Sequence, residues 1–245
     1  MSLRLYVGCA GWSLPRDAQA MFPAEGTHLQ RYAARFPAVE INSSFYRPHR
    51  PATYARWAAS VGETFRFTVK LPRSITHERR LRDVTAPLEA FVGQATALGE
   101  KLGAVLVQLP PSLDFTAGIA HDFLAALRAR FSGQVALEPR HPAWFGPAAT
   151  DLLMAHRIAR VAADPAPVPA AAEPGGWMEP VYLRLHGSPR MYYSPYDEHY
   201  LDALAIRLLQ FARSATVWCM FDNTALGAAT PDALGLLKRL SSPAP

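Results

Sequence analysis

The chain has 245 residues, of which 50% are hydrophobic and 18% charged, and it carries a formal net charge of +5. These values are typical of a globular protein with a substantial core, and they exclude a disordered or low-complexity chain. No apolar run approaches the ~18 residues that a membrane span needs, so we expect a cytoplasmic protein with no membrane partner. Cys9 and Cys219 lie in apolar runs and are too few for a disulfide framework, which predicts buried free thiols.

Short β-rich runs alternate with helical patterns along the whole chain. The expected strands are residues 5–8, 38–42, 65–70, 104–109, 134–140, 159–164, 181–186 and 216–222. The expected helices lie near residues 28–36, 51–60, 85–101, 118–130, 147–156, 199–213 and 230–240. After the sixth strand the stretch PAPVPAAAEPGGW (165–177) is too rich in Pro and Gly for a helix, so we expect the sixth helix to be reduced or missing.

This alternation predicts an α/β fold, a single (β/α)8 TIM-type barrel spanning residues 1–245, with 241–245 as a frayed tail. A doubly wound open sheet is the competing architecture. It usually carries a glycine-rich phosphate turn after the first strand, and the turn GCAGWS (8–13) lacks that spacing.

The polar residues of the strands lie on one face and gather toward the carboxyl ends. Side chains alternate between the two faces of a strand, so each run has an apolar face for the helices and a second face toward the barrel interior. That second face carries Glu40, Asn42, Lys70, Gln108, Glu138, Arg140, Arg184 and His186. Barrel enzymes keep their chemistry at this end, which predicts a ligand site there. A structural salt-bridge network of Glu40 or Glu138 with Arg184 is the alternative.

Loop residues complete the predicted site. Trp12, His77, Tyr192 and Asn223 follow the first, third, seventh and eighth strands. We expect Glu138, His186, His77 and Lys70 to be the catalytic candidates, because imidazole and buried carboxyl or amine groups can transfer protons near neutral pH. We assign substrate binding to Arg140, Arg184, Asn42, Glu40, Gln108, Tyr192, Asn223 and Trp12. His141 falls outside this face and is expected to anchor its loop.

Seven stretches resemble the YecE-like family, a domain of unknown function. They are GCAGWS (8–13), VEINSSFYR (39–47), FTVKLPRSITH (67–77), LGAVLVQLPP (102–111), EPRHPAW (138–144), YLRLHG (182–187) and FDNTALGAATPDAL (221–234). The resemblance covers the whole chain in order and implies a TIM-type barrel without an established reaction. The family commonly has Thr-Ser at Cys9-Ala10, Tyr at Leu14, and Asn-Asn at Asp222-Asn223.

Three functions remain open from the sequence. The first is an enzyme, with a hydrolase favoured, that acts by general acid/base chemistry on an anionic substrate such as a phosphorylated compound, nucleotide or sugar derivative. Lys70 could alternatively form a Schiff base. The second is a metal-assisted phosphodiesterase of endonuclease type. No cofactor is predicted, but a divalent metal would use Glu138, His186 and Asp164. The third is a non-catalytic module that binds a nucleotide or nucleic acid. The sequence leaves the oligomeric state undetermined.

Overall fold

The computed structural model describes residues 4–241 of the chain. The frayed tail expected at 241–245 lies outside these residues, except for Ser241, which ends helix α8. Within the described range, no helix combines the length and the mean hydropathy needed to cross a membrane. Cys9 and Cys219 are free and buried, as the sequence predicts.

Within residues 4–241, ten strands form two mainly parallel sheets. The first has the order β1-β10-β9-β7 and the second has the order β2-β3-β4-β5-β6-β8. Their bounds are β1 (Leu5–Cys9), β2 (Ala38–Ile41), β3 (Arg66–Lys70), β4 (Leu102–Gln108), β5 (Gln134–Glu138), β6 (Ala159–Arg160), β7 (Ala162–Asp164), β8 (Gly175–Gly176), β9 (Val181–Leu185) and β10 (Val217–Phe221). Every pairing is parallel except that of β6 with β8. All parallel strands therefore bring their carboxyl ends to one side.

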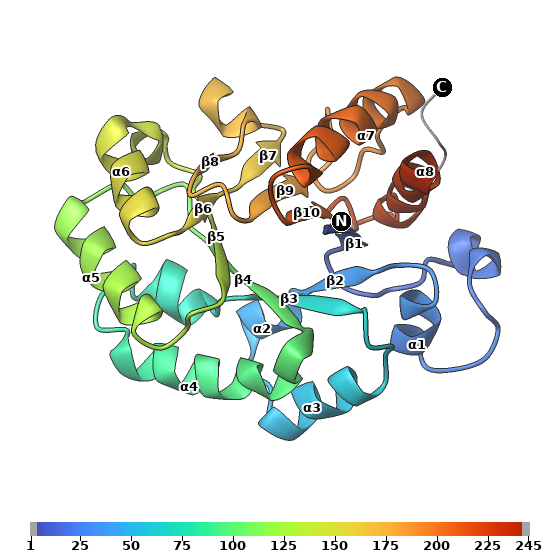
Figure 1. Cartoon of the computed structure of the whole chain (residues 1–245), viewed down its shortest axis with the longest axis horizontal. Coiled ribbons are helices and arrows are strands. Elements are labelled where there is room, and N and C mark those ends of the chain that lie inside the picture. Colours follow the sequence, from blue (N-terminus) through green and yellow to red (C-terminus); the bar gives the residue numbers. More distant parts are fainter. Residues whose placement is uncertain (1–3, 242–245) are drawn as a thin grey trace.

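Helices follow most of the strands and lie outside them (Figure 1). The α-helices are α1 (His28–Ala33), α2 (Ser43–Tyr46), α3 (Pro51–Ala59), α4 (Thr85–Ala95), α5 (Ala117–Arg128), α6 (Pro147–Ala155), α7 (Glu198–Ala212) and α8 (Ala229–Ser241). Shorter helical turns are η1 (Arg16–Met21), η2 (Ser74–Glu78), η3 (Thr96–Lys101), η4 (Pro142–Phe145) and η5 (Pro169–Ala172). Between β7 and β9 the described helical structure is the 3-10 turn η5, followed by the short strand β8, which confirms that the sixth helix is reduced.

The predicted strand 159–164 is divided in the structure. β6 pairs with β5 and β7 pairs with β9, so the break at Val161 is where the chain passes from one sheet to the other. The prediction of one continuous strand was wrong because each half has a different neighbour. The hydrogen-bonded strands are arranged in two open sheets.

The hydroxyl group of Tyr32 links β1 to β2 beside a single backbone bridge. Their sole ladder contact in the described chain is the parallel bridge between Ala10 and Glu40. Further toward the start of the strands, the backbone N–H of Cys9 donates to Tyr32 Oη at 2.8 Å, and that hydroxyl donates to the carbonyl of Ala38 at 3.0 Å. The Tyr32 side chain thus satisfies two buried backbone groups that would otherwise lack partners.

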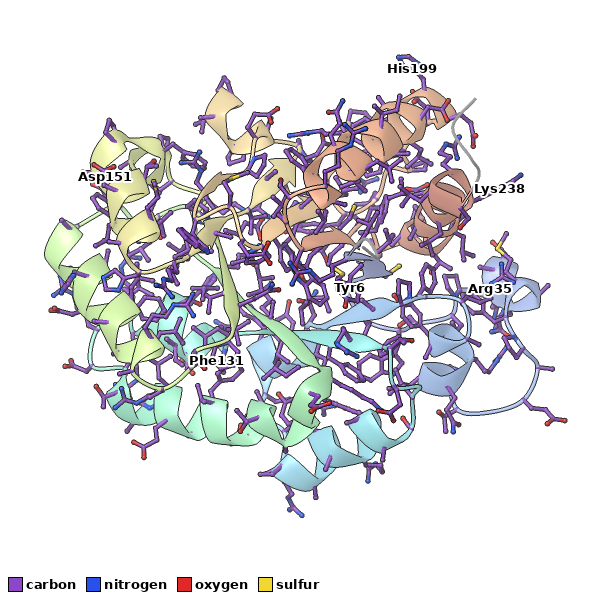
Figure 2. The ribbon with its side chains drawn as sticks, in the orientation of Figure 1. Tyr6, Arg35, Phe131, Asp151, His199 and Lys238 are labelled. Atoms are coloured by element: carbon purple, nitrogen blue, oxygen red, sulfur yellow. The ribbon has the colours of Figure 1, made fainter. Side chains whose placement is uncertain are left out.

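Buried apolar side chains form two clusters, one on the outer face of the strands and one on the inner face. The larger one lies between strands and helices and includes Val7, Val39 and Leu137. The smaller one draws on both sheets and is made of Ala38, Ala104, Leu106, Ala136, Ala159, Val161, Tyr182, Trp218 and Met220, with Tyr6 packed against it. Tyr6 stacks on Trp218 with ring centroids 4.4 Å apart and lies among the strands (Figure 2). The inner face is therefore apolar at its amino-terminal half.

Gly8 permits the close approach of β1 to β2. A Cβ atom at this position would lie 2.2 Å from the carbonyl oxygen of Ala38, which is backbone and cannot move aside cheaply. We expect Gly8→Ala to lower the free energy of unfolding by roughly 1–3 kcal/mol, as overpacking does. Urea denaturation would measure this change.

Gly93 supplies the matched control, because a Cβ atom there meets nothing within 4 Å on helix α4. Gly93→Ala should raise the free energy of unfolding by about 0.5–1 kcal/mol through helix propensity. Equal effects at both glycines would contradict the account of the β1–β2 contact.

Candidate functional site

A fully buried guanidinium group lies at the centre of the carboxyl-terminal ends of the strands. Arg184 of β9 is 0% exposed. Its Nε and Nη2 atoms donate to Glu40 at 3.1 and 2.6 Å, and its Nη1 atom donates to Glu138 Oε2 at 2.8 Å. Nη2 also donates to Asp222 Oδ2 at 3.0 Å. Arg184 therefore joins acids from β2, from β5 and from the residue after β10.

Glu138 is the second residue of the network with several hydrogen-bonding partners. Its Oε1 atom lies 2.7 Å from Arg140 Nη2 and 2.8 Å from His186 Nε2. Its Oε2 atom accepts from Arg184 and, at 3.0 Å, from the side-chain amide of Gln108. Both oxygens are thus engaged by two donors each, so this carboxylate has little capacity left for a substrate proton.

His186 is held between two acids. Its Nδ1 atom lies 3.0 Å from Asp222 Oδ2 and its Nε2 atom lies 2.8 Å from Glu138 Oε1. The Nε2 atom is also 2.8 Å from Arg140 Nη2. His186 therefore links Asp222 to the pair formed by Glu138 and Arg140.

Uncharged side chains complete the network at its inner edge. The hydroxyl of Tyr182 donates to Glu40 Oε2 at 2.8 Å and is 2.9 Å from Thr68 Oγ1. Asn42 reaches Asp222 Oδ1 more weakly, with its Nδ2 atom at 3.5 Å, and its Oδ1 atom is buried without a partner. Both oxygens of Glu40 are therefore bound by protein donors.

Neighbouring positive charges keep Glu138 and Asp222 ionised. Burial alone raises the pKa of Glu138, but the charges of Arg184, Arg140 and His186 outweigh it and hold this pKa well below its ordinary value. Burial likewise acts against Asp222, yet Arg184 and the hydrogen bond from His186 lower its pKa. Burial also acts to lower the pKa of Arg184, but the negative charges of Glu40, Asp222 and Glu138 outweigh it and raise this pKa.

Lys70, which ends β3, stands apart from this hydrogen-bonded network. Its side chain is buried, and its Nζ atom lies over the ring of Phe45, 4.3 Å from the centroid. In the described part of the chain it forms no ion pair within 4 Å and no side-chain hydrogen bond. Burial lowers the pKa of Lys70 to about 8, and the charge of Arg184 adds to this lowering.

Arg140 also has unused hydrogen-bonding capacity. Its Nη2 atom contacts Glu138 and His186, while its Nε atom is buried without a hydrogen-bond partner. A buried donor without a partner is unfavourable and calls for an acceptor. Arg140 and Lys70 are thus the two cations of this region whose donors the protein does not fully use.

Cavities flank the network at the same ends of the strands. One of about 320 Å³ is lined by residues 44–48, 72–74 and 78, among them Phe45, Arg47 and Arg73. Phe45 therefore contacts both this space and the amine of Lys70. Another cavity, of about 150 Å³, lies beside the ends of β1 and β10 and is lined by residues 9–11, 13, 15, 224, 227, 229 and 230.

The four predicted loop residues do not enter the hydrogen-bonded network. His77 contacts Thr76 and lies edge-on to Phe45, and burial together with the charge of Lys70 lowers its pKa. Trp12 packs against Trp57. Tyr192 comes nearest, with its ring edge-on to His186 at 5.7 Å and a φ of 70°.

Asn223 has a structural role instead. Its Nδ2 atom donates to Asp232 at 2.7 Å and to the carbonyl of Ser194 at 2.9 Å, which fixes helix α8 to the loop before α7. His141 likewise stays in its loop, where its ring accepts from the backbone N–H of Ala143, as the sequence predicts.

The structure does not assemble the metal ligands that the sequence offered. Asp164 Oδ1 accepts from the hydroxyl of Tyr196 at 2.9 Å. Among residues 4–241, no three His, Cys, Asp or Glu side chains are arranged to hold a metal ion. No hydrogen bond or ion pair in the described chain joins the Asp164 side chain to Glu138 or His186.

The predicted catalytic and substrate-binding residues did not include three residues of the site. Asp222 binds both Arg184 and His186, Tyr182 binds Glu40, and Phe45 covers Lys70. The alternation of side chains along a strand could have identified two of them. Tyr182 lies on the same inward face as Arg184, and Asp222 follows Phe221, which faces outward. Phe45 carried no signal beyond its aromatic type.

The fold and this network define an α/β protein with a buried charged cluster at the carboxyl ends of parallel strands. Residues 6–245 match the family described as protein of unknown function DUF72, and the chain belongs to this family. It is 30% identical to the YecE protein of Escherichia coli over 143 residues, 58% of this chain and 50% of the relative. It is 31% identical to the YunF protein of Bacillus subtilis over 156 residues, covering 53% of that protein. The predicted YecE-like resemblance is confirmed, and the chain spans about half the length of these curated relatives.

Solved structures of the family share the fold. A DUF72 family protein from Enterococcus faecalis matches with a TM-score of 0.82 at 22% identity, covering 98% of this chain and 97% of that one. A DUF72 family protein from Thermotoga maritima matches with a TM-score of 0.79 at 26% identity, covering 97% and 99%. The architecture of this chain is therefore that of its family.

Replacing Arg184 by Met would leave three buried acids without their common partner. We expect Arg184→Met to lower the free energy of unfolding at neutral pH by about 3–5 kcal/mol, the range for breaking a buried ion pair. Arg207→Met removes a more exposed arginine, paired with Glu173 at 2.7 Å, and should cost less than about 1 kcal/mol. Urea denaturation of both variants measures the difference.

The pH dependence of these variants has a definite sign. Glu138 and Asp222 have depressed pKa values in the folded protein, so their stabilisation is present above about pH 4 and is lost as the pH falls through the folded values. Without Arg184, burial would favour the protonated acids, so the deficit of Arg184→Met should shrink between about pH 7 and pH 5. A deficit that stays constant over this range would contradict the network.

Proposed function

We propose that the protein is an enzyme that acts on an anionic substrate at the carboxyl-terminal ends of its strands, with Lys70 and Arg140 as the groups that meet the substrate. The observation that carries this proposal is the amine of Lys70, which is buried yet has no ion pair or side-chain hydrogen bond in the described chain. A buried cation without a counter-ion is costly unless a ligand supplies the missing charge.

The pairing of the charges supports an anionic ligand. Glu40, Glu138 and Asp222 are each bound to Arg184. The amine of Lys70 has no ion pair within 4 Å in the described chain and lies over the ring of Phe45. A negative group of a substrate would supply the ion pair that Lys70 lacks.

The roles that we propose for these residues differ from those expected from the sequence. Glu138 and His186 are saturated with protein partners, so we assign them to holding Arg140 and Arg184 in place rather than to transferring protons. Lys70 is the better acid/base candidate, because a pKa of about 8 lies near the working range of proton-transfer groups. This proposal includes no metal ion.

We further infer that the two sheets are parts of one (β/α)8 barrel in a single domain. Two features support closure: the segment 159–164 pairs with one sheet through β6 and with the other through β7, and the Ala10–Glu40 bridge links β1 to β2. The charged network would then fill the carboxyl-terminal end of the barrel above its apolar inner cluster.

Removal of the Lys70 charge should weaken anion binding. With inorganic phosphate as the probe, we expect Lys70→Met to raise the dissociation constant at least about ten-fold, which corresponds to about 1.4 kcal/mol. Titration calorimetry or phosphate-dependent thermal stabilisation measures this. Lys238→Met removes the same charge from the periphery of the molecule (Figure 2) and should bind phosphate like the unaltered protein. If both variants lost the same affinity for phosphate, net charge alone would explain the binding.

Anion binding should also follow the titration of Lys70. Its amine is protonated below its pKa of about 8 and neutral above it, so phosphate affinity should be high near pH 7 and should fall as the pH rises through about 8. The same titration in Lys70→Arg should be flat over this range, since a guanidinium keeps its proton. An identical fall in Lys70→Arg would show that another group controls binding.

A further inference from the structure

We propose that Lys70 is a nucleophilic amine that forms an imine with the carbonyl group of an anionic oxo acid. This inference rests on the proposed function and deepens it, because it assigns a substrate class and a covalent step to the same site. Lys70 is the one lysine side chain beside the network, since the other two lysines of the chain are Lys101 and Lys238.

The geometry leaves the Lys70 amine available. The acids nearest to it electrostatically, Glu40, Glu138 and Asp222, are each bound to Arg184 instead. No ion pair or side-chain hydrogen bond within the described range occupies its Nζ atom, and the side chain retains 7% exposure. Lys101 provides the contrast, because its Nζ atom donates to the carbonyls of Ala58 and Val61 at 2.8 Å each.

Burial and a neighbouring cation favour the neutral amine that a nucleophile needs. The side chain of Lys70 is buried at the end of β3, and the charge of the buried Arg184 guanidinium acts on it. A lysine removed from water and placed near another cation loses its proton more readily, which is a recognised way to activate an amine. The pKa of about 8 agrees with this, so a substantial fraction of Lys70 is neutral near physiological pH.

The neighbouring groups indicate which carbonyl compound would fit. Arg140 has a buried Nε atom without a partner, and a planar guanidinium matches a carboxylate or phosphate group. A cavity of about 320 Å³ lies on the other side of this region; Phe45 lines it and also contacts the amine of Lys70, whereas Lys70 and Arg140 are not among its lining residues. A short oxo acid has the two required groups, a carbonyl carbon and an anion.

The reaction balances without a redox partner. The neutral Nζ atom adds to the carbonyl carbon, forming a C–N bond as the carbonyl π electrons move to oxygen. One amine proton passes to that oxygen to give a carbinolamine. Expulsion of the hydroxyl group as water, with the second amine proton, leaves the C=N bond. The negative group of the substrate stays on Arg140, so it neutralises the iminium charge that protonation creates.

Trapping of the imine tests this proposal on the unaltered protein. We would incubate the full chain at about pH 7.5 with glyoxylate and cyanoborohydride, which reduces an imine to a stable carboxymethyl amine, and map the modified lysines by peptide mass spectrometry. Labelling of the protein unfolded in urea, where all three lysines are exposed, normalises the rates. We expect Lys70 to react at least about ten-fold faster than Lys101 and Lys238 relative to this reference.

Controls separate this proposal from the proposed function. Lys70→Arg keeps the positive charge but has no nucleophilic amine, so it should still bind phosphate while the principal adduct disappears. Inorganic phosphate should protect Lys70 in the unaltered protein, because both probes use the same cations. Labelling of Lys70 no faster than the other lysines, with phosphate binding intact, would overturn the imine and leave the anion site standing. Loss of phosphate binding as well would overturn both.

Discussion

The buried guanidinium of Arg184 is the constraint on which the rest of the site depends. An ionised group with no exposure to water is tolerated only where opposite charges and hydrogen bonds surround it. Those charges come from Glu40, Glu138 and Asp222, which lie on different strands or follow them in the chain. The network therefore fixes how β2, β5, β9 and β10 sit relative to one another. It ties together two sheets that share few backbone hydrogen bonds.

The same guanidinium connects stability with chemistry. It lowers the pKa of the acids that hold it, and it also disfavours the ammonium form of Lys70. Acids that are fully engaged cannot serve as proton carriers, while an amine without a partner can. The cluster thus separates into residues that hold the site, centred on Arg184, and residues with unused capacity, Lys70 and Arg140. This separation is the physical basis for assigning the reactive role to Lys70.

Asp222 shows how one position changes this balance. The resemblance to the YecE-like family leads us to expect Asn there, whereas this chain has an acid that accepts from Arg184 and His186. With a neutral amide at this position, Glu40 and Glu138 would face two arginines and the cluster would carry one negative charge less. Asp222 therefore supplies one of the three carboxylates that surround Arg184.

The sequence by itself determined the order of the elements, the parallel strands, the reduced sixth helix and the inward face that carries Glu40, Glu138 and Arg184. These follow from local patterns, because alternation and turn residues act over a few positions. Only the tertiary structure decided which polar residues meet. It brought Asp222 into the network, paired Asp164 with the hydroxyl of Tyr196, bound Asn223 to Asp232 of helix α8, and placed Lys70 over Phe45 without an ion pair in the described chain. Such choices depend on competition among buried groups from distant strands for a limited number of partners, and no short stretch of sequence records its outcome.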